Sequence, residues 1–458
     1  MTEVPRNPEN KKFNKNRKVV VTGLGMVSPL GLDVKTSWEK LIAGGTGIVP
    51  VEMPFVKDVK VAGLVSNFNP RIALEGFVTP KDLRRISTPA QYATAAAIEA
   101  CRDAGFFEGK GNKLRDGIDP NEVGVRIGSG IGGGTHISEV SEKIKAGVNG
   151  DTFDVLLILP ERVSSVPGMK LGFKGPLGMP SAACATGNLA ITDGYKDILL
   201  GDADISVVGG AESTVDHVTL NVFDRIKALS HETDPKEACR PFDKKRNGFV
   251  MGEGAAVIVL EEKRHAEKRN AKIYAELAGY GNTSDAYSDT APDPNGEGAA
   301  RAMEKAIAKM HGLPKKGLIY IQAHGTGTEM NDKIEISVIK RVMIENHKRK
   351  NIAVSSSKGA TGHSLAGAGA MGAVFGIQAL EYGILPPTIN LTEPMDEAAG
   401  IDLVPNIGKK AKPVAVFIDS FGFGGFNTVT VFKKYKRGML GDVKYFLKKT
   451  FPFAAKKH

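Results

Sequence analysis

Residues 181–188 read Ser181-Ala-Ala-Cys184-Ala-Thr-Gly-Asn188, so small side chains surround a single cysteine. Apolar residues recur at helical spacing from Leu189 to Leu199, which predicts a helix directly after this cysteine. The start of a helix favours negative charge because backbone N–H groups and the positive end of the dipole lie there. We therefore expect a sharp strand-to-helix turn at Cys184, a lowered pKa for its thiol and a role as a nucleophile.

Two histidines lie in turns rich in Gly, Thr and Ser, each after a predicted strand. His324 begins a His-Gly-Thr-Gly-Thr motif, and His363 ends the motif Lys358-Gly-Ala-Thr-Gly-His363. Ligands of parallel α/β sheets gather beyond the carboxyl ends of strands, so these histidines and Cys184 are expected to converge. An isolated cysteine is more often a buried structural residue, but the two histidine motifs favour the catalytic interpretation.

Predicted strands and helices alternate along the chain, which favours a mainly parallel α/β architecture. Strands are predicted over residues 19–25, 123–127, 205–212, 255–260, 273–280, 318–323, 352–356, 414–418 and 428–432. Helices are predicted over residues 36–43, 90–104, 261–269, 298–311 and 366–382. We divide the chain into a disordered polar arm (1–16), a half with the nucleophile (17–271), a half with both histidines (272–434) and a basic apolar tail (435–458).

The net charge of +10 is concentrated in two terminal segments. Residues 1–18 hold six Lys or Arg and two Glu, and residues 433–458 hold nine Lys or Arg and one Asp. The remaining body is close to neutral, which argues against a nucleic-acid groove. The three cysteines Cys101, Cys184 and Cys239 are too few for a disulfide framework, so we expect a reducing, cytoplasmic location. No transmembrane run, signal peptide or metal motif is predicted.

A glycine-rich loop follows the predicted strand at 123–127 and covers residues 128–134. Its glycines formally fit a dinucleotide-binding spacing, but any glycine-dense run fits it easily, and the acidic residue expected downstream is missing. Glycine also permits close backbone approach. We therefore interpret the loop as a close-packed turn beside a substrate tunnel rather than as a phosphate site.

Four motifs occur in the order and spacing of one known family: Ala-Cys-Ala-Thr-Gly, His-Gly-Thr-Gly-Thr, Lys-Gly-Ala-Thr-Gly-His and Ser-Phe-Gly-Phe-Gly-Gly. Residues 17–434 resemble a β-ketoacyl-acyl-carrier-protein synthase of the elongating, synthase II-like type. The resemblance implies the thiolase fold, in which two similar α/β halves form five αβαβα layers, and a homodimer. It also implies a decarboxylating Claisen condensation with malonyl-acyl-carrier protein in type II fatty-acid synthesis.

The resemblance assigns the chemistry to four groups. Cys184 would take the acyl chain from the phosphopantetheine of acyl carrier protein, so no other cofactor and no metal is expected. Decarboxylation builds charge on the malonyl thioester oxygen, which neutral imidazoles at His324 and His363 would stabilise. The backbone N–H groups of Cys184 and Phe423 would form the oxyanion hole for the acyl carbonyl.

Further roles follow from the resemblance alone. Lys358 would be a positioning residue paired with Asp332 or Glu335, and Phe423 would also gate the acyl tunnel. The remaining residues are Thr326, Thr328 and Thr290 for the phosphopantetheine arm, Ile131 and Phe223 for the acyl chain, and Lys81, Arg84 and Arg85 for docking of the acidic carrier protein.

Two positions depart from the family pattern. Gly372 stands where a buried Glu belongs to a cation-associated network, and Phe426 stands where a Thr is usual. A thiolase or synthase III type enzyme is disfavoured by the second histidine, His363. A polyketide or aryl-polyene ketosynthase remains an alternative. A non-catalytic chain-length factor would lack Cys184.

The tail beyond Lys434 extends past the body of the family. It combines Lys residues with Met, Leu, Tyr and Phe, and Pro452 would end any helix within it. The tail could pack on the dimer, capture the acidic carrier protein, or lie on an anionic membrane, since an interfacial helix needs such a basic and aromatic combination. All three interpretations stay open at this point.

Overall fold

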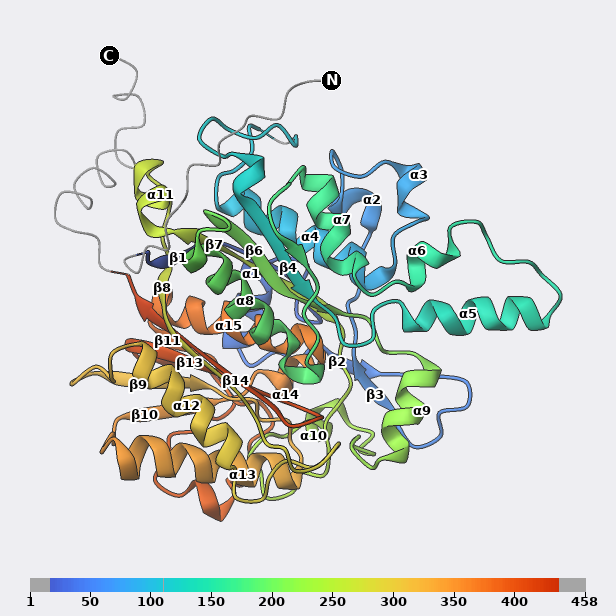
Figure 1. Cartoon of the computed structure of the whole chain (residues 1–458). Coiled ribbons are helices and arrows are strands. Elements are labelled where there is room, and N and C mark those ends of the chain that lie inside the picture. Colours follow the sequence, from blue (N-terminus) through green and yellow to red (C-terminus); the bar gives the residue numbers. More distant parts are fainter. Residues whose placement is uncertain (1–16, 110, 436–458) are drawn as a thin grey trace.

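The computed structural model describes residues 17–109 and 111–435 (Figure 1). The predictions for the arm 1–16 and for the tail from residue 436 onward lie outside the described residues. Ten strands form one sheet in the order β10-β9-β13-β14-β8-β1-β7-β6-β4-β5. Five of them come from the first half of the chain: β1 (Val19–Val27), β4 (Val123–Gly128), β5 (Leu177–Gly178), β6 (Ile205–Glu212) and β7 (Gly254–Glu262). The others are β8 (Ala275–Ser284), β9 (Leu318–Gln322), β10 (Ile352–Ser355), β13 (Pro413–Gly422) and β14 (Phe426–Lys434).

The two sets of five strands repeat one topology. We number the strands of each set from one to five in chain order. Read from the outer edge of the sheet to its middle, both sets then have the strand order 3-2-4-5-1. In both sets the third, second and fourth strands are parallel to one another. The pairs of fourth with fifth and of fifth with first are antiparallel. The sets join only through two residue pairs between β1 and β8. Two similar halves are therefore present although no sequence repeat is visible.

The prediction of a mainly parallel sheet is wrong, because the sheet is mixed. In the second half, the three-residue turn Phe423–Gly425 connects β13 directly to β14, and such a hairpin is antiparallel by construction. Alternation of helices and strands along the sequence does not reveal which strands become neighbours. The predicted strands themselves are confirmed, with ends that shift by a few residues.

Three helical layers enclose the two half-sheets. Helices α4 (Thr88–Asp103) and α7 (Arg162–Leu171) cover the first half, and α12 (Glu297–Lys309) and α13 (Glu329–Ile339) cover the second. Helices α8 (Thr186–Leu200) and α15 (Ala366–Tyr382) lie between the halves and contact strands of both. Side chains of consecutive strand residues point to opposite faces of the sheet. Phe417 and Ile418 therefore enter different apolar cores. The five-layered thiolase fold is thus confirmed.

Shorter elements complete the described chain. The helices are α1 (Val34–Ile42), α2 (Pro70–Ala73), α3 (Pro80–Leu83), α5 (Gly134–Lys145), α6 (Asp154–Ile158), α9 (His217–Arg225), α10 (Pro235–Ala238), α11 (Lys263–Lys268) and α14 (Lys358–Thr361). The short strands are β2 (Ile48–Pro50), β3 (Val61–Gly63), β11 (Ile384–Leu385) and β12 (Lys409–Lys410). No described helix is long and apolar enough to cross a membrane.

The two central helices cross closely near their N-termini, and this crossing positions the site. A Cβ at Gly187 of α8 would lie 2.6 Å from the carbonyl oxygen of Ala366 in α15, so only glycine fits there. Asn188 then ties α8 to the β13–β14 hairpin, because its amide donates to the carbonyl oxygens of Ile418 (2.9 Å) and Thr428 (3.1 Å). The segments that precede α8 and α15 are thereby held side by side.

Candidate active site

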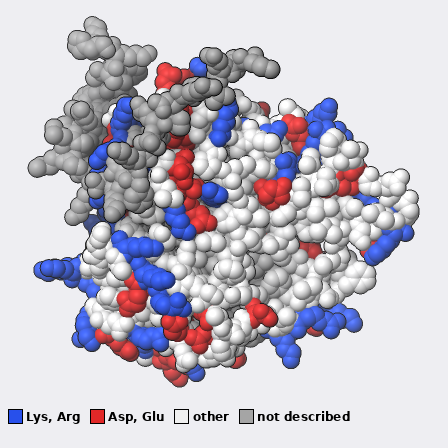
Figure 2. All heavy atoms as spheres, in the orientation of Figure 1, with Lys and Arg blue, Asp and Glu red and all other residues white. Residues whose placement is uncertain are grey.

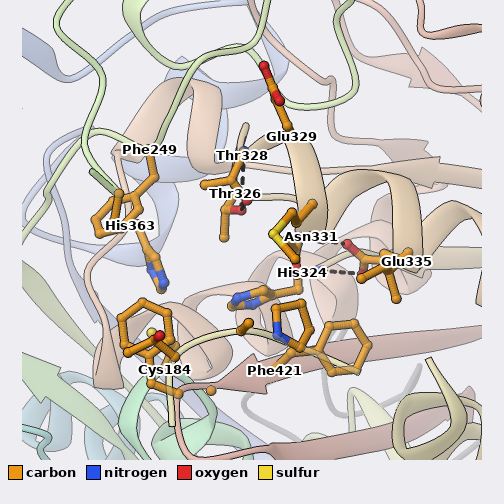
Figure 3. A pocket seen from close by; sticks show the side chains of 18 of the residues that line it. Cys184, Phe249, His324, Thr326, Thr328, Glu329, Asn331, Glu335, His363 and Phe421 are labelled. Atoms are coloured by element: carbon orange, nitrogen blue, oxygen red, sulfur yellow. Dashed lines mark hydrogen bonds between the residues drawn. The ribbon is translucent and has the colours of Figure 1, made fainter. Parts of the chain in front are cut away.

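A cavity of about 660 Å³ lies where these segments meet the carboxyl ends of β9 and β13 (Figure 3). Cys184, His324 and His363 all line it, so the structure brings the three predicted residues together. Figure 3 shows both imidazoles beside Cys184, and the centroids of the two imidazole rings are 5.3 Å apart. The cavity wall also includes four aromatic side chains, those of Phe223, Phe249, Phe421 and Phe423.

The turn that presents Cys184 is strained and braced. Residues Ala183–Ala185 form a 3₁₀ turn before α8, and Ala183 has a φ of 46°, a left-handed conformation that costs a residue with a Cβ about 1–3 kcal/mol. The Thr186 hydroxyl holds the turn: it accepts from the Ala182 N–H and donates to the Ala183 carbonyl, both at 2.7 Å. The expected sharp entry into the helix is therefore present.

The expectation of a lowered thiol pKa is wrong. Burial raises the pKa of Cys184 to about 12, and the positive charge of Lys358 only partly opposes this rise. Cys184 is 8% exposed, so a thiolate there would be poorly hydrated. The lost hydration energy exceeds the stabilisation that the backbone N–H groups and the dipole at the helix start provide. The resting nucleophile is a thiol, so its proton must leave during the reaction.

The backbone around Cys184 adjoins the turn that carries Phe423. A Cβ at Gly422 would lie 2.6 Å from the Ala182 carbonyl oxygen and 3.3 Å from the Cys184 nitrogen, so glycine allows the two chains to touch. This contact brings the residue before Phe423 to the Cys184 backbone N–H. The two amides that the resemblance implies for an oxyanion hole therefore belong to adjoining turns.

Two buried carboxylates shape the turn that carries His324. Glu335 accepts from the backbone N–H groups of His324 and Gly325, both at 2.7 Å (Figure 3). Asp332 accepts from the backbone N–H groups of Thr326 at 3.0 Å and of Phe242 at 2.8 Å. These bonds fix the turn, so the carboxylates position the imidazole without touching it.

Lys358 makes no direct ion pair with Asp332 or Glu335 in the part of the chain that the structure describes. The charge of Glu335 is nevertheless the strongest that acts on it, and it opposes the fall in the pKa of Lys358 that burial causes. Its ammonium instead donates to the carbonyl oxygen of His324. The carboxylates are already occupied by backbone N–H groups, so Lys358 acts on the same turn through the backbone. It remains the cation of a buried cluster.

Both imidazoles are neutral in this environment. Burial lowers the pKa of His324 and of His363 well below 6.5, and the charge of Lys358 adds to the effect. His363 is 1% exposed, and neither ring nitrogen has a hydrogen-bond partner among residues 17–109 and 111–435. Its ring contacts Phe249 edge-on at 5.1 Å between centroids. A buried imidazole without a protein partner is free to bond a substrate atom.

Hydroxyl groups from two loops line the cavity. Thr326 and Thr328 face one another at 2.9 Å between their hydroxyl oxygens (Figure 3). Thr290 also lines the cavity, from the exposed loop after β8. The three predicted arm-binding threonines thus share one cavity with Cys184.

Aromatic and aliphatic side chains build the apolar wall. Phe423 stacks on Phe223 with centroids 6.3 Å apart and ring planes 19° apart, and Phe249 packs edge-on against Phe223 at 6.0 Å. Ile131 does not line the cavity, but it packs against the same apolar cluster as Cys184. Phe249 was not predicted, although it belongs to a glycine-punctuated loop typical of a site wall.

Two family models cover most of the chain. Residues 16–266 match the beta-ketoacyl synthase N-terminal domain, and residues 274–392 match the beta-ketoacyl synthase C-terminal domain. The chain belongs to the beta-ketoacyl synthase family. This β-ketoacyl synthase is 38% identical over 431 residues to the 3-oxoacyl-[acyl-carrier-protein] synthase 2 of Staphylococcus aureus (strain N315), with 93% of this chain and 100% of that protein covered.

Two solved structures show the same fold. One is the ishigamide ketosynthase/chain length factor, with a TM-score of 0.81 and 32% identity. The other is a type II PKS acyl-carrier protein in complex with its ketosynthase bound to the hexaketide, with a TM-score of 0.80 and 29% identity. Each comparison covers 92% of this chain and 100% of the other.

The glycine-rich loop of this synthase is organised by an internal carboxylate. Glu212 is fully buried and accepts from the Ser129 hydroxyl and the Gly130 N–H, both at 2.8 Å, and from the Ile131 N–H at 3.3 Å. The N–H groups that would hold a phosphate are thus occupied, which supports the close-packed interpretation. The loop does not line the cavity that contains Cys184, but its Ile131 packs against the same apolar cluster as Cys184, and its place beside the acyl tunnel stays a prediction.

The surroundings of Gly372 do not fit a cation site. A Cβ there would lie 3.2 Å from Cγ of Gln322 and 3.5 Å from a methyl group of Ile418. The nearby polar atoms bond to one another: the Tyr320 hydroxyl donates to Gln322 at 2.6 Å and lies 2.7 Å from the Ser355 hydroxyl. An uncharged network therefore joins β9 and β10 below the two histidine turns. The described residues also contain no group of three His, Cys, Asp or Glu that could hold a metal.

The three predicted docking residues lie apart from the cavity. Lys81 and Arg84 are exposed, and the Arg85 guanidinium lies 3.6 Å from the centroid of the Phe153 ring. None of the three lines the cavity that contains Cys184. Their role in docking stays a prediction.

Proposed function

We propose that this β-ketoacyl synthase condenses an acyl group on Cys184 with malonyl-acyl-carrier protein to give 3-oxoacyl-acyl-carrier protein in type II fatty-acid synthesis. The observation that carries the proposal is the convergence of a buried thiol and two neutral imidazoles on one largely apolar cavity. The similarity to the 3-oxoacyl-[acyl-carrier-protein] synthase 2 of Staphylococcus aureus supports fatty-acid elongation over the polyketide alternative.

Acyl transfer comes first in the proposed cycle. The Cys184 sulfur attacks the carrier thioester, a new C–S bond forms, and the bond to the phosphopantetheine sulfur breaks. The thiol proton passes to the departing sulfur through an imidazole, which His324 or His363 can provide because both are neutral. The Cys184 and Phe423 amides stabilise the tetrahedral oxyanion.

Decarboxylation and condensation follow. The malonyl C–C bond breaks, carbon dioxide leaves, and the electron pair moves onto the thioester oxygen as an enolate. N–H groups of His324 and His363 stabilise that oxygen. The enolate carbon then attacks the acyl-Cys184 carbonyl, and the C–S bond to the enzyme breaks. The released Cys184 thiolate takes a proton from water, which restores the thiol. Neutral rings suit this step because a charged imidazolium would need hydration that the buried site does not supply.

Docking and assembly complete the proposal. Lys81, Arg84 and Arg85 would attract the acidic acyl carrier protein, and the carrier complex of the related ketosynthase supports this partner. The enzyme would act as a homodimer through the sheet edge at β5 and the projecting α5 (Figure 1), where Ile137 and Ile144 are exposed. Three free cysteines agree with a cytoplasmic location.

Product analysis tests the proposal. Purified enzyme is given malonyl-acyl-carrier protein and acyl-carrier proteins of several chain lengths, and the products are identified by mass spectrometry. We expect 3-oxoacyl products that are two carbons longer than each starting chain, and none from a Cys184→Ala variant. Chains extended repeatedly without reduction would instead support a polyketide synthase.

A further inference from the structure

Four segments at one end of the second half-sheet contain only basic charges. Residues 311–317, 346–351, 409–413 and 433–435 hold ten Lys or Arg and no Asp or Glu. The sequence gives no sign that they belong together, because residues 318–345, 352–408 and 414–432 separate them. The order and pairing of the strands in the sheet bring the four segments to the same end of the second half.

Strand pairing places the four segments together. The parallel ladders pair the first residues of β9, β10 and β13, as shown by Ile319 with Ile352 and by Leu318 with Pro413. Lys434, at the end of the antiparallel β14, pairs with the first residue of β8. Each basic segment directly precedes or follows one of these strand ends. The guanidinium of Arg349 also joins two of the segments, since it donates to the carbonyl oxygen of Lys315 at 2.9 Å.

Six lysines of this region are exposed, and none forms an ion pair with a residue in the described ranges. We call these six residues the basic end: Lys315, Lys316, Lys348, Lys350, Lys410 and Lys412. Lys and Arg side chains are frequent at the left of Figure 2, with some Asp and Glu among them, over the region where Figure 1 labels β9 and α12. These six ammonium groups thus have no carboxylate at ion-pair distance within the described chain.

Apolar side chains are exposed beside the basic end. Tyr382, the last residue of α15, is 59% exposed, and Ile407 is 67% exposed. Lys410 pairs with Ile384 two residues beyond Tyr382, and a Cβ at Gly383 would lie 3.2 Å from Cγ of Lys412. Cationic and apolar groups thus share one surface, as they do in segments that lie at a membrane interface.

The basic end faces away from the cavity. Strands β9, β10 and β13 start at the basic end, and their carboxyl ends lead to His324, Lys358 and Phe423. The ten residues of β13 span about 33 Å at about 3.3 Å per residue. A carrier protein docked at the basic end would therefore not face the cavity of the same subunit, which argues against carrier binding there.

We propose that the basic end binds the surface of an anionic lipid bilayer and holds the enzyme with its cavity turned toward the solvent. The lysines provide attraction to lipid phosphates, and Tyr382 and Ile407 enter the interface between headgroups. The bilayer then lies on the side of the molecule opposite to the mouth through which carrier proteins enter. The proposal concerns a surface outside the catalytic cavity, so it does not depend on the proposed reaction.

Vesicle sedimentation tests the proposal with the full-length chain. Vesicles of phosphatidylcholine are compared with vesicles that also contain phosphatidylglycerol, at low and high sodium chloride. The test variant carries Lys315→Gln, Lys316→Gln, Lys348→Gln and Lys350→Gln. The control variant carries Lys57→Gln, Lys113→Gln, Lys236→Gln and Lys245→Gln, four exposed lysines of the first half, and it has the same net charge.

We expect salt-sensitive binding that requires phosphatidylglycerol. A lysine near an anionic surface contributes about fivefold to affinity, so the test variant is expected to bind at least about a hundredfold more weakly. The control variant should change little, and both should keep full condensing activity because no substituted residue lines the cavity. Equal loss in both variants, no binding to anionic vesicles, or tighter binding to a DNA duplex than to these vesicles would overturn the proposal.

Discussion

Removal of the His363 imidazole is expected to slow condensation without preventing acylation. Neither ring nitrogen has a protein partner in this buried site, and burial keeps the ring neutral by lowering its pKa. An N–H group is thus already placed for the enolate oxygen, and nothing competes for it. Loss of one such donor typically costs about 3–4 kcal/mol of transition-state stabilisation, which corresponds to a rate that is about 100- to 1000-fold lower.

Separate rates are needed to test this reasoning. For His363→Ala, carbon dioxide release from malonyl-acyl-carrier protein and formation of the 3-oxoacyl product should both decline by that factor. Acylation of Cys184, followed by intact-protein mass spectrometry, should persist because His324 can still relay the thiol proton. His231→Ala is the control, since this exposed histidine only pairs with Asp224. Decarboxylation at a near-normal rate would refute the assigned role, as would loss of acylation alone.

Three further predictions concern other parts of the chain. Burial and the charge of Glu335 raise the pKa of Asp419 well above its ordinary value. The folded state therefore keeps a proton that the unfolded chain loses above about pH 4. The free energy of unfolding then falls as the pH rises from about 4 toward the folded-state pKa. Asp419→Asn should therefore raise the Tm at neutral pH and not below about pH 4; an equal Tm at neutral pH would contradict this. The Phe426 ring packs on the turn, since a Cβ at Gly424 would lie 3.3 Å from it. Phe426→Thr should therefore loosen this turn and speed the hydrogen exchange of its amides. Unchanged exchange would show that the ring does not stabilise the turn. Deletion of residues 436–458 should weaken binding to anionic vesicles and leave condensation kinetics unchanged; a raised, salt-sensitive KM for carrier protein would indicate carrier capture instead.

The local parts of the fold and of the site could be predicted from the sequence. Strand ends that lead into Gly-, Thr- and Ser-rich turns pointed to His324 and His363, and the structure places both beside Cys184. The five-layered arrangement followed from resemblance to a family. The relative direction of neighbouring strands could not be predicted from the residues alone. The strands β7, β8 and β14 are antiparallel to their neighbours because of contacts between residues that are distant in sequence.

Electrostatic expectations failed where burial dominates. The helix start at Cys184 suggested a lowered pKa, yet loss of hydration raises it, and the sequence does not state how deeply a thiol will be buried. The pairing of Lys358 with Glu335 acts only at a distance, because the nearby carboxylates bind backbone N–H groups of the His324 turn. Glu212 was missed for a similar reason: apart from the Ser129 hydroxyl, its partners are backbone N–H groups of the loop, which leave no signal in the sequence.

The most direct test of the central claim follows one acyl group through the enzyme. The full chain is incubated with acyl-carrier protein, digested and examined by mass spectrometry, and malonyl-acyl-carrier protein is then added to a second sample. We predict one acyl group on the peptide that contains Cys184, none on peptides with Cys101 or Cys239, and loss of that group as a 3-oxoacyl product two carbons longer appears. An acyl group on Cys101 or Cys239, or an acyl-Cys184 that malonyl-acyl-carrier protein does not consume, would contradict the account.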